Sequence, residues 1–174
     1  MKNTASNAAP ETSAVYEVPA QTRIGHVHLQ VTSINKALEF YRDILGFKVT
    51  QRFGEQAAFI SAGDYHHHIG LNTWNSLNGP PARKQGAGLY HTAILYARRA
   101  ELAGALRQLA AAKYPITGSA DHGVSEAIYL DDPDGNGVEL YWDRPQDQWP
   151  LAPDGSVQMY TRALDLNALL AEYA

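Results

Sequence analysis

The first patterned stretch of the chain alternates between apolar and polar positions. In RIGHVHLQV, from Arg23 to Val31, one set of side chains is apolar (Val27, Leu29, Val31) and the other is polar (His26, His28, Gln30). This period of two predicts a strand with one polar face. Ser33 is placed to cap a following helix and Gly46 to end it, with apolar residues at helical spacing between them.

The chain contains the order strand, helix and three strands twice. Three short strands beginning at Phe47, Gln56 and His66 complete a first β-α-β-β-β unit, and a linker rich in Gly, Pro and Asn follows Trp74. The second unit is predicted to contain a strand, a helix and three more strands (88–96, 99–114, 115–117, 126–131 and 138–142). We therefore predict an α+β fold in which two paired βαβββ modules, residues 23–74 and 88–145, form one pseudo-symmetric domain over 23–145.

The two ends of the chain lie outside this repeat. Residues 1–22 have no apolar stretch of the kind found in secretory signals, and we expect a disordered tail. Residues 146–174 are expected to form an irregular extension that ends in a helix from about Ala163.

Composition narrows the classes of function. The 174 residues include no cysteine, which excludes disulfides, thiolate metal sites and a cysteine nucleophile. A formal net charge of −4 without a basic cluster argues against a nucleic-acid partner, and no apolar run approaches the length that spans a membrane. By default we expect a cytoplasmic protein. A chain of this size buries enough surface to fold without a metal, so we expect any bound metal to be functional.

The repeat pairs particular side chains. Superposing the first strands of the two units puts His26 on His91, and superposing the last strands puts Gly70 on Glu139. If the two units pack as a pseudo-symmetric pair, two imidazoles and one carboxylate converge in the cleft between the sheets. That set is typical of the facial triad of non-haem Fe(II), although Mn(II) accepts the same donors. Glycine has no ligating atom, so the sequence predicts three metal ligands: His26, His91 and Glu139.

Several phrases resemble the vicinal oxygen chelate superfamily, which includes glyoxalase I, antibiotic resistance proteins and extradiol dioxygenases. They are GHVHLQV…ALEFYRDILGF, YHTAI and YLDDPDGNGVELYW, and the likeness covers residues 23 to 145. The run from His122 through Tyr129 to Glu139 (H-x5-I-Y-x2-D-P-x-G-x3-E) is similar to the signature of extradiol dioxygenases of the catechol 2,3-dioxygenase type. The resemblance implies Fe(II)-dependent cleavage of a catechol-like ring beside its diol, with a small aromatic diol and O2 as partners.

The resemblance also implies roles for individual residues. His26, His91 and Glu139 would hold the metal, and His122 and Tyr129 would hold the oxygens of the bound diol. The acid/base histidine of the family lies in a motif that matches Tyr65 to Gly70. Alignment of the motif favours His67, whereas strand parity favours His68, and either imidazole can exchange protons near neutral pH.

The remaining expectations concern the substrate cavity and the alternatives. We expect His28 and His68 to contact substrate, and Phe59, Trp74 and Tyr141 to favour a flat ring. A glyoxalase-like lyase or isomerase with four metal ligands and a non-catalytic antibiotic-binding protein are the alternative functions, and the superfamily suggests a homodimer. Residues 132–143 approximate a calcium loop, but a strand follows Gly137, so we interpret Asp132 to Asn136 as a hairpin turn.

Overall fold

The first module forms one four-stranded sheet with a helix packed on one face. The structure, a computed structural model, describes residues 15–83 and 85–173. The strands of this sheet are β1 (Val27–Gln30), β2 (Lys48–Phe53), β3 (Ala57–Ser61) and β4 (Ile69–Asn72), in the spatial order β1-β4-β3-β2. β1 and β4 are parallel, and the other neighbours are antiparallel. This is the β-α-β-β-β unit that the sequence predicts.

The helix after β1 begins and ends near the predicted residues. α1 (Ile34–Leu38) is capped by the Ser33 side chain, which accepts a hydrogen bond from the backbone N–H of Lys36. It continues as the π-helical segment η1 (Glu39–Ile44), which the sequence did not predict, and Gly46 follows at φ 84°. The wider π turn lets the adjacent Phe40 and Tyr41 both face the core, where each is 1% exposed.

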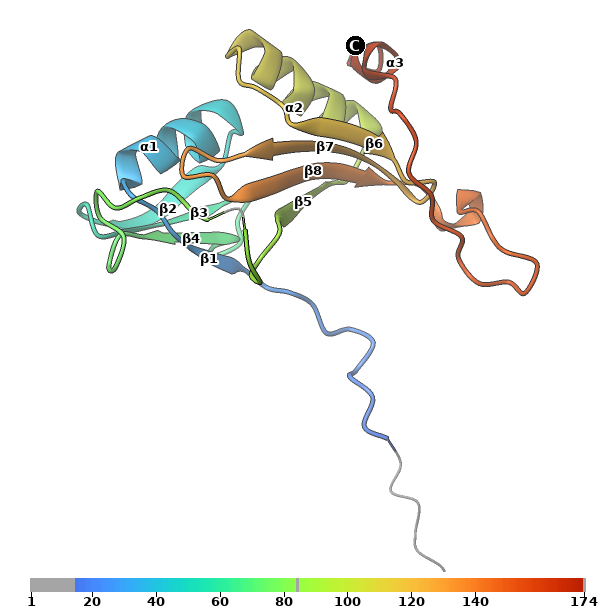
Figure 1. Ribbon diagram of the computed structural model, residues 1–174, viewed down its shortest axis with the longest axis horizontal. Helices are drawn as coiled ribbons and strands as arrows, with labels where there is room; N and C mark the ends of the chain where they lie inside the picture. The colour runs from blue at the N-terminus through green and yellow to red at the C-terminus, as the bar shows by residue number, and fades with distance from the viewer. Residues whose placement is uncertain (1–14, 84, 174) are drawn as a thin grey trace, which may run out of the picture.

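The second module repeats this arrangement. Its elements are β5 (Thr92–Tyr96), α2 (Arg99–Ala111), β6 (Gly118–Asp121), β7 (Ser125–Asp131) and β8 (Gly137–Asp143), with strand order β5-β8-β7-β6. α1 and α2 lie on the same side of the two sheets (Figure 1). The described residues contain no helix with the length and apolar character needed to cross a membrane.

The strand register reproduces the internal symmetry. His28 of β1 pairs with Gly70 of β4, and Ala93 of β5 pairs with Glu139 of β8. The first member of each pair lies two residues after His26 or His91. The predicted equivalence of the two histidines, and of Gly70 with Glu139, therefore holds in the backbone.

Several predicted strands differ in extent from the observed ones. β1 and β5 begin at Val27 and Thr92, later than the starts predicted at residues 23 and 88. The short strand expected at 115–117 is instead β6, because Pro115 has no N–H to donate and pairing to β7 starts only with the Thr117 N–H on the Tyr129 carbonyl. The strand expected from His66 begins at Ile69, since the chain bends between Gly63 and His68.

The two modules share one apolar core and several polar contacts. Phe40 packs on Tyr114 with ring centroids 4.8 Å apart, and the Tyr41 hydroxyl donates to Oδ2 of buried Asp132 at 3.1 Å. Asp132 also accepts from Asp134 N–H and from the backbone and side-chain nitrogens of Asn136, all at 2.9 Å. Protein donors therefore satisfy the carboxylate in this turn, as the hairpin interpretation requires.

The last 30 residues return across the second sheet. After η2 (Gln146–Gln148) the chain forms a loop and ends in α3 (Leu166–Leu170), which lies beside α2 (Figure 1). Asp165 caps α3 by accepting from Asn167 N–H and Ala168 N–H, so the helix starts slightly later than predicted. Most of the tail predicted to be disordered, residues 1–14, lies outside the described residues, and residues 15–22 contain no helix or strand.

Candidate metal and substrate site

His91 and Glu139 form the centre of the candidate site. His91 precedes β5 and Glu139 lies on the neighbouring β8, and His91 Nε2 is 2.9 Å from Glu139 Oε2. Glu139 is only 12% exposed, and the buried Nδ1 of His91 has no hydrogen-bond partner. Since imidazole and carboxylate both carry lone pairs, a close pair of this kind is suited to hold a proton or a cation between them.

Tyr129 and His122 continue the polar chain from Glu139. Tyr129 lies on β7 directly opposite Glu139, and its hydroxyl donates to Glu139 Oε1 at 3.0 Å. The Tyr129 hydroxyl is also 2.7 Å from His122 Nε2. Burial, reinforced by the charge of Glu139, raises the pKa of Tyr129 to about 12. The hydroxyl therefore keeps its proton at neutral pH and can donate it to a hydrogen-bond acceptor.

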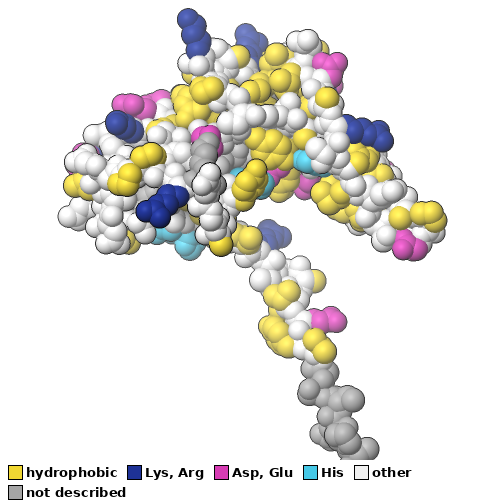
Figure 2. All heavy atoms as spheres, viewed as in Figure 1, with side chains coloured by type: hydrophobic (Ala, Val, Ile, Leu, Met, Phe, Trp, Pro, Cys, Tyr) yellow, Lys and Arg dark blue, Asp and Glu magenta, His cyan; other side chains and the backbone are white. Residues whose placement is uncertain are grey.

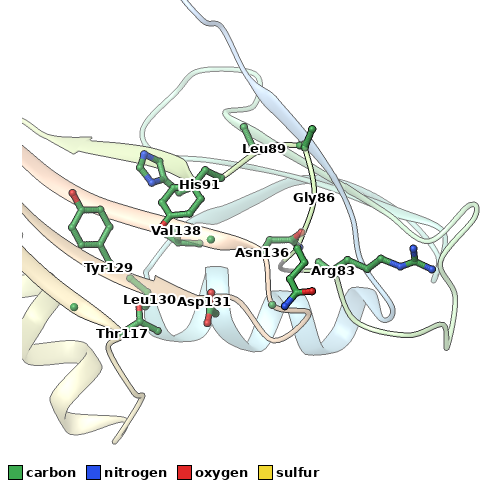
Figure 3. Close-up of a pocket in the computed structure, with 18 residues that line it drawn as sticks. Arg83, Gly86, Leu89, His91, Thr117, Tyr129, Leu130, Asp131, Asn136 and Val138 are labelled. Carbon is green, nitrogen blue, oxygen red and sulfur yellow. The ribbon is translucent and has the colours of Figure 1, made fainter.

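A cavity of about 800 Å³ lies beside these side chains and is lined in part by His91 and Tyr129. Its walls come from the inter-module linker and from the strands of the second sheet (Figure 3), and the residues that matter here are Tyr90, His91, Tyr129, Asn136 and Val138. The volume suits a small organic molecule, and the lining mixes apolar and polar groups in the way that ligand pockets do. The linker had no role in the sequence-based prediction, because its Gly- and Pro-rich composition carries no chemical signal.

A second group of histidines lies on the first sheet. The rings of His26 and His67 are 4.6 Å apart, and Nδ1 of His66 is 2.7 Å from Nδ1 of His67. Burial and then the charge of His66 lower the pKa of His67, while burial and then His26 lower that of His28. Both effects favour neutral imidazoles, which can accept protons or bind a metal.

The residues around this group explain two features of the sequence. His28 contacts Phe59 and Trp74, two of the three aromatic residues expected near the substrate. A side chain at position 70 would meet the His28 ring at 2.9 Å, so Gly70 leaves room for that imidazole. No metal ligand can therefore be provided at position 70 without moving His28.

His67 and His68 have different surroundings. His68 Nδ1 accepts from Ala62 N–H at 3.3 Å and lies 2.9 Å from the hydroxyl of buried Ser61. His67 instead contacts Phe59 and His26. His67 Nδ1 also has a partner, His66 Nδ1 at 2.7 Å, so each of the two histidines has one ring nitrogen engaged. The hydrogen bonds do not choose between them, and His67 stays the predicted acid/base residue on the motif alignment.

The structure brings together part of the predicted site. His91, Glu139, Tyr129 and His122 form a continuous chain, whereas His26 and His67 contact each other on the first sheet. Histidine atoms are visible at separate places on the face shown in Figure 2. Across residues 15–83 and 85–173, no three acidic or histidine side chains gather closely enough to hold one ion. Two of the three proposed donors therefore fit a metal as placed, and His26 does not.

Sequence comparisons agree with this fold. A profile described as the Glyoxalase/Bleomycin resistance protein/Dioxygenase superfamily matches residues 23–140. The match includes strands of both four-stranded sheets of the fold, and the chain belongs to that superfamily. The predicted family resemblance and fold are thereby confirmed.

Two relatives of the chain are named as dioxygenases. It is 39% identical over 151 residues to catechol-2,3-dioxygenase of Bacillus subtilis, a match that covers 87% of this chain and 52% of that protein. It is 29% identical over 128 residues to biphenyl-2,3-diol 1,2-dioxygenase 2 of Rhodococcus globerulus, covering 71% and 64%. The chain thus spans about half to two thirds of the length of these curated relatives.

Solved structures support the fold alone. A glyoxalase/dioxygenase from Nostoc punctiforme has a TM-score of 0.58 and 21% identity, covering 76% of this chain and all of that one. Lactoylglutathione lyase from Agrobacterium tumefaciens has a TM-score of 0.56 and 22% identity, covering 71% and 96%. Proteins with different printed names share this architecture, so the site rather than the fold has to carry the functional argument.

Proposed function

We propose that the chain is an Fe(II)-dependent extradiol dioxygenase that opens a catechol-like ring next to its diol, using O2. The observation that carries the proposal is the contact of His91 with Glu139, continued through Tyr129 to His122 beside the cavity. The names of the relatives at 39% and 29% identity support it.

We assign His91, Glu139 and His26 as the residues that hold the metal. Fe(II), or Mn(II) in its place, would supply open coordination positions where a diol and O2 can bind together. The assignment requires His26 to leave His67, its neighbour in the structure, before it can join the other two donors.

The other residues act on the substrate and its protons. Tyr129 presents a protonated hydroxyl next to Glu139, and with His122 it would orient the two diol oxygens through hydrogen bonds. His67 would accept one hydroxyl proton and return it later, with His68 as the alternative. His28, held against Phe59 and Trp74, would contact the ring of the substrate.

Anaerobic reconstitution tests the proposal. The protein is loaded with Fe(II) without oxygen, mixed with a panel of catechols, and then exposed to O2 while oxygen uptake and yellow ring-opened product are recorded. We expect both signals with at least one catechol. Glu139→Gln, which keeps the side-chain shape and removes the charge, should abolish both, whereas Glu101→Gln on the exposed end of α2 should not. Stoichiometric iron without oxygen uptake across the panel would contradict the proposal.

The two alternatives predict different metal behaviour. A glyoxalase-like enzyme needs a fourth protein donor, and position 70 has none because the His28 ring occupies the space beside it. A protein that only sequesters an antibiotic needs no metal at all. Elemental analysis after anaerobic purification distinguishes them: tightly bound zinc would favour the isomerase, and a metal-free protein with drug affinity would favour the binding protein. The expected homodimer stays a prediction.

A further inference from the structure

The C-terminal extension packs against the hairpin that carries His122. Asp121 and Arg162 form an antiparallel bridge, with both backbone N–H···O contacts at 2.9 Å, on the edge strand β6. The Tyr160 N–H donates to the His122 carbonyl at 3.2 Å. The Tyr160 ring comes so close to Gly123 (φ 80°) that a side chain there would meet it at 2.6 Å. The hairpin and the extension therefore fit each other at a residue that only glycine can occupy.

This packing surrounds one nitrogen of the His122 imidazole. Nδ1 of His122 lies 3.1 Å from the Tyr160 carbonyl oxygen and 3.2 Å from the Thr161 hydroxyl. A carbonyl oxygen can only accept a hydrogen bond, so the short contact requires Nδ1 to carry the hydrogen. In a neutral imidazole the other nitrogen, Nε2, is then a bare acceptor.

The bare nitrogen faces the candidate site. His122 Nε2 is 2.7 Å from the Tyr129 hydroxyl, which is also 3.0 Å from Glu139 Oε1. The hydroxyl has a single hydrogen and two acceptors, so it can satisfy only one of them at a time. In the Nδ1–H tautomer the 2.7 Å contact takes this hydrogen to His122 Nε2, and the donation to Glu139 Oε1 requires the hydroxyl to rotate. With the opposite tautomer, Nε2 would donate to Tyr129 and the hydroxyl hydrogen would stay with Glu139. The tautomer of His122 thus decides whether the Tyr129 hydroxyl donates its hydrogen to His122 or to Glu139.

We propose that Tyr160 and Thr161 are positioning residues for His122, and that the Tyr160 carbonyl holds it as the Nδ1–H tautomer with Nε2 as the acceptor that faces the Tyr129 hydroxyl. The C-terminal extension is therefore part of the site rather than only a packing element. The inference rests on the proposed function for its catalytic meaning, but the tautomer itself does not depend on metal or substrate.

Nuclear magnetic resonance of the metal-free protein tests the tautomer. Long-range 1H–15N spectra of histidine-labelled full-length chain are recorded at about pH 9, where a histidine side chain is ordinarily neutral. His122 is assigned by the signal that disappears in His122→Gln. We expect its Nδ1 to be protonated and its Nε2 bare. A protonated Nε2, or averaged signals from both tautomers, would overturn the proposal even if the protein proves to be an active dioxygenase.

Two variants separate positioning from simple packing. Tyr160→Ala removes the ring that packs on Gly123 and under the Arg162 guanidinium, 4.0 Å from the ring centre, and should shift the His122 nitrogen signals toward a tautomer mixture. Tyr173→Ala is the matched control, because Tyr173 lies elsewhere on the same extension, where its ring contacts Gly104 and Arg107 of α2. This variant should leave the His122 signals unchanged. Identical His122 spectra in the parent and Tyr160→Ala would contradict the positioning role.

The iron-loaded enzyme provides the kinetic counterpart. Tyr160→Ala keeps the backbone carbonyl but removes the ring that fixes its place against the hairpin. We expect it to lower kcat on the order of tenfold while changing KM little, as is typical when an outer hydrogen-bond partner of a site is displaced. Tyr173→Ala should retain the parent kcat. An equal loss of kcat in both variants would show that the extension acts through general stability and would refute the proposal.

Discussion

Nε2 of His91 and Oε2 of Glu139 face each other at 2.9 Å across two parallel strands of the second sheet. The backbone register places Glu139 beside the start of β5, so the contact follows from the strand pairing and not from a flexible loop. The carboxylate is mostly buried and the imidazole partly exposed, and a proton or a cation between them offsets the cost of burying the carboxylate charge.

This contact predicts a loss of metal in variants of either partner. His91→Ala or Glu139→Gln should weaken Fe(II) binding by more than the roughly tenfold loss that outer-sphere changes cause. Iron content after anaerobic loading and desalting is the measurement. Glu101→Gln, on an exposed carboxylate paired with Arg98, is the control and should retain iron. Full iron occupancy in Glu139→Gln would contradict the assignment.

Variants of His67 and His68 should differ in turnover and in thermal stability. His67→Ala should keep bound iron and lose turnover by roughly a hundredfold, because general acid/base groups contribute about that much or more. His68→Ala should unfold at lower temperature than the parent, because Ser61 is buried and its hydroxyl loses an imidazole partner. Steady-state kinetics and thermal melts provide the two readouts. A larger loss of turnover in His68→Ala would transfer the acid/base role to His68.

Tyr129 should titrate late. Its pKa is raised to about 12, so between about pH 10, the ordinary value, and pH 12 the unfolded chain has released this proton while the folded chain retains it. The contribution of Tyr129 to stability is therefore present below pH 10 and is lost as the pH rises toward 12. Ultraviolet titration of metal-free protein should show that Tyr129→Phe removes one late-titrating phenol. Loss of a phenol that titrates near pH 10 would be the contrary result.

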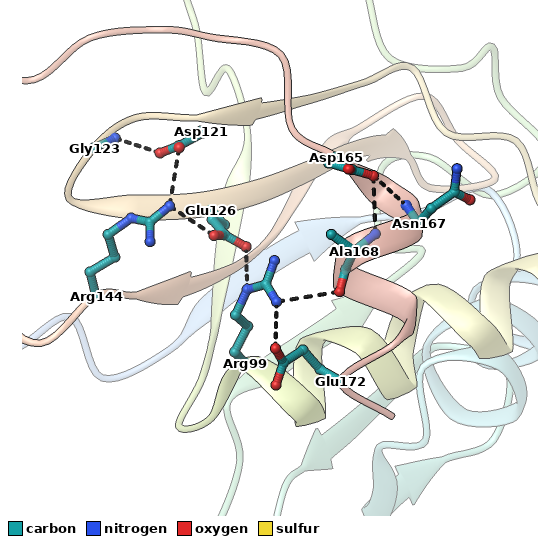
Figure 4. Close-up of polar contacts among 9 residues, drawn as sticks. All are labelled: Arg99, Asp121, Gly123, Glu126, Arg144, Asp165, Asn167, Ala168 and Glu172. Atoms are coloured by element: carbon teal, nitrogen blue, oxygen red, sulfur yellow. Dashed lines mark hydrogen bonds and ion pairs between the residues drawn. The ribbon is translucent and has the colours of Figure 1, made fainter. Parts of the chain in front are cut away.

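A buried ion-pair network anchors the C-terminal extension. Glu126 of β7 is 3% exposed and forms ion pairs with Arg99 at 2.7 Å and with Arg144 at 2.8 Å (Figure 4). Arg99 also forms an ion pair with Glu172, which follows α3. Arg144 additionally contacts Asp121, next to His122. The network therefore links α2, the end of β8 and the extension around one carboxylate.

Removing that carboxylate charge should destabilise the protein. Glu126→Gln removes the buried charge that the two guanidinium groups share and leaves Arg99 paired only with Glu172 and Arg144 only with Asp121. We expect it to lower the free energy of unfolding by about 2 kcal/mol, as is typical when a hydrogen bond to a charged group is lost. Urea unfolding measures the change. Glu101→Gln breaks the pair with exposed Arg98 but leaves an amide oxygen that can still accept the Arg98 N–H at the start of α2, so it should have little effect. Equal midpoints for Glu126→Gln and the parent would show that the network does not stabilise the fold.

Periodicity and motifs were sufficient to establish the family and the doubled βαβββ topology, because strand alternation, Ser33, Gly46 and the turn at Asp132 are local signals. The register of Gly70 and Glu139 followed from the repeat alone. The grouping of the histidines was decided by packing instead: His26 meets His67 on one sheet while His91 meets Glu139 on the other. The contact of Tyr160 with His122 joins residues 38 apart through an irregular segment. No pattern along the chain encodes such a contact, since it depends on where the extension crosses the edge of the second sheet.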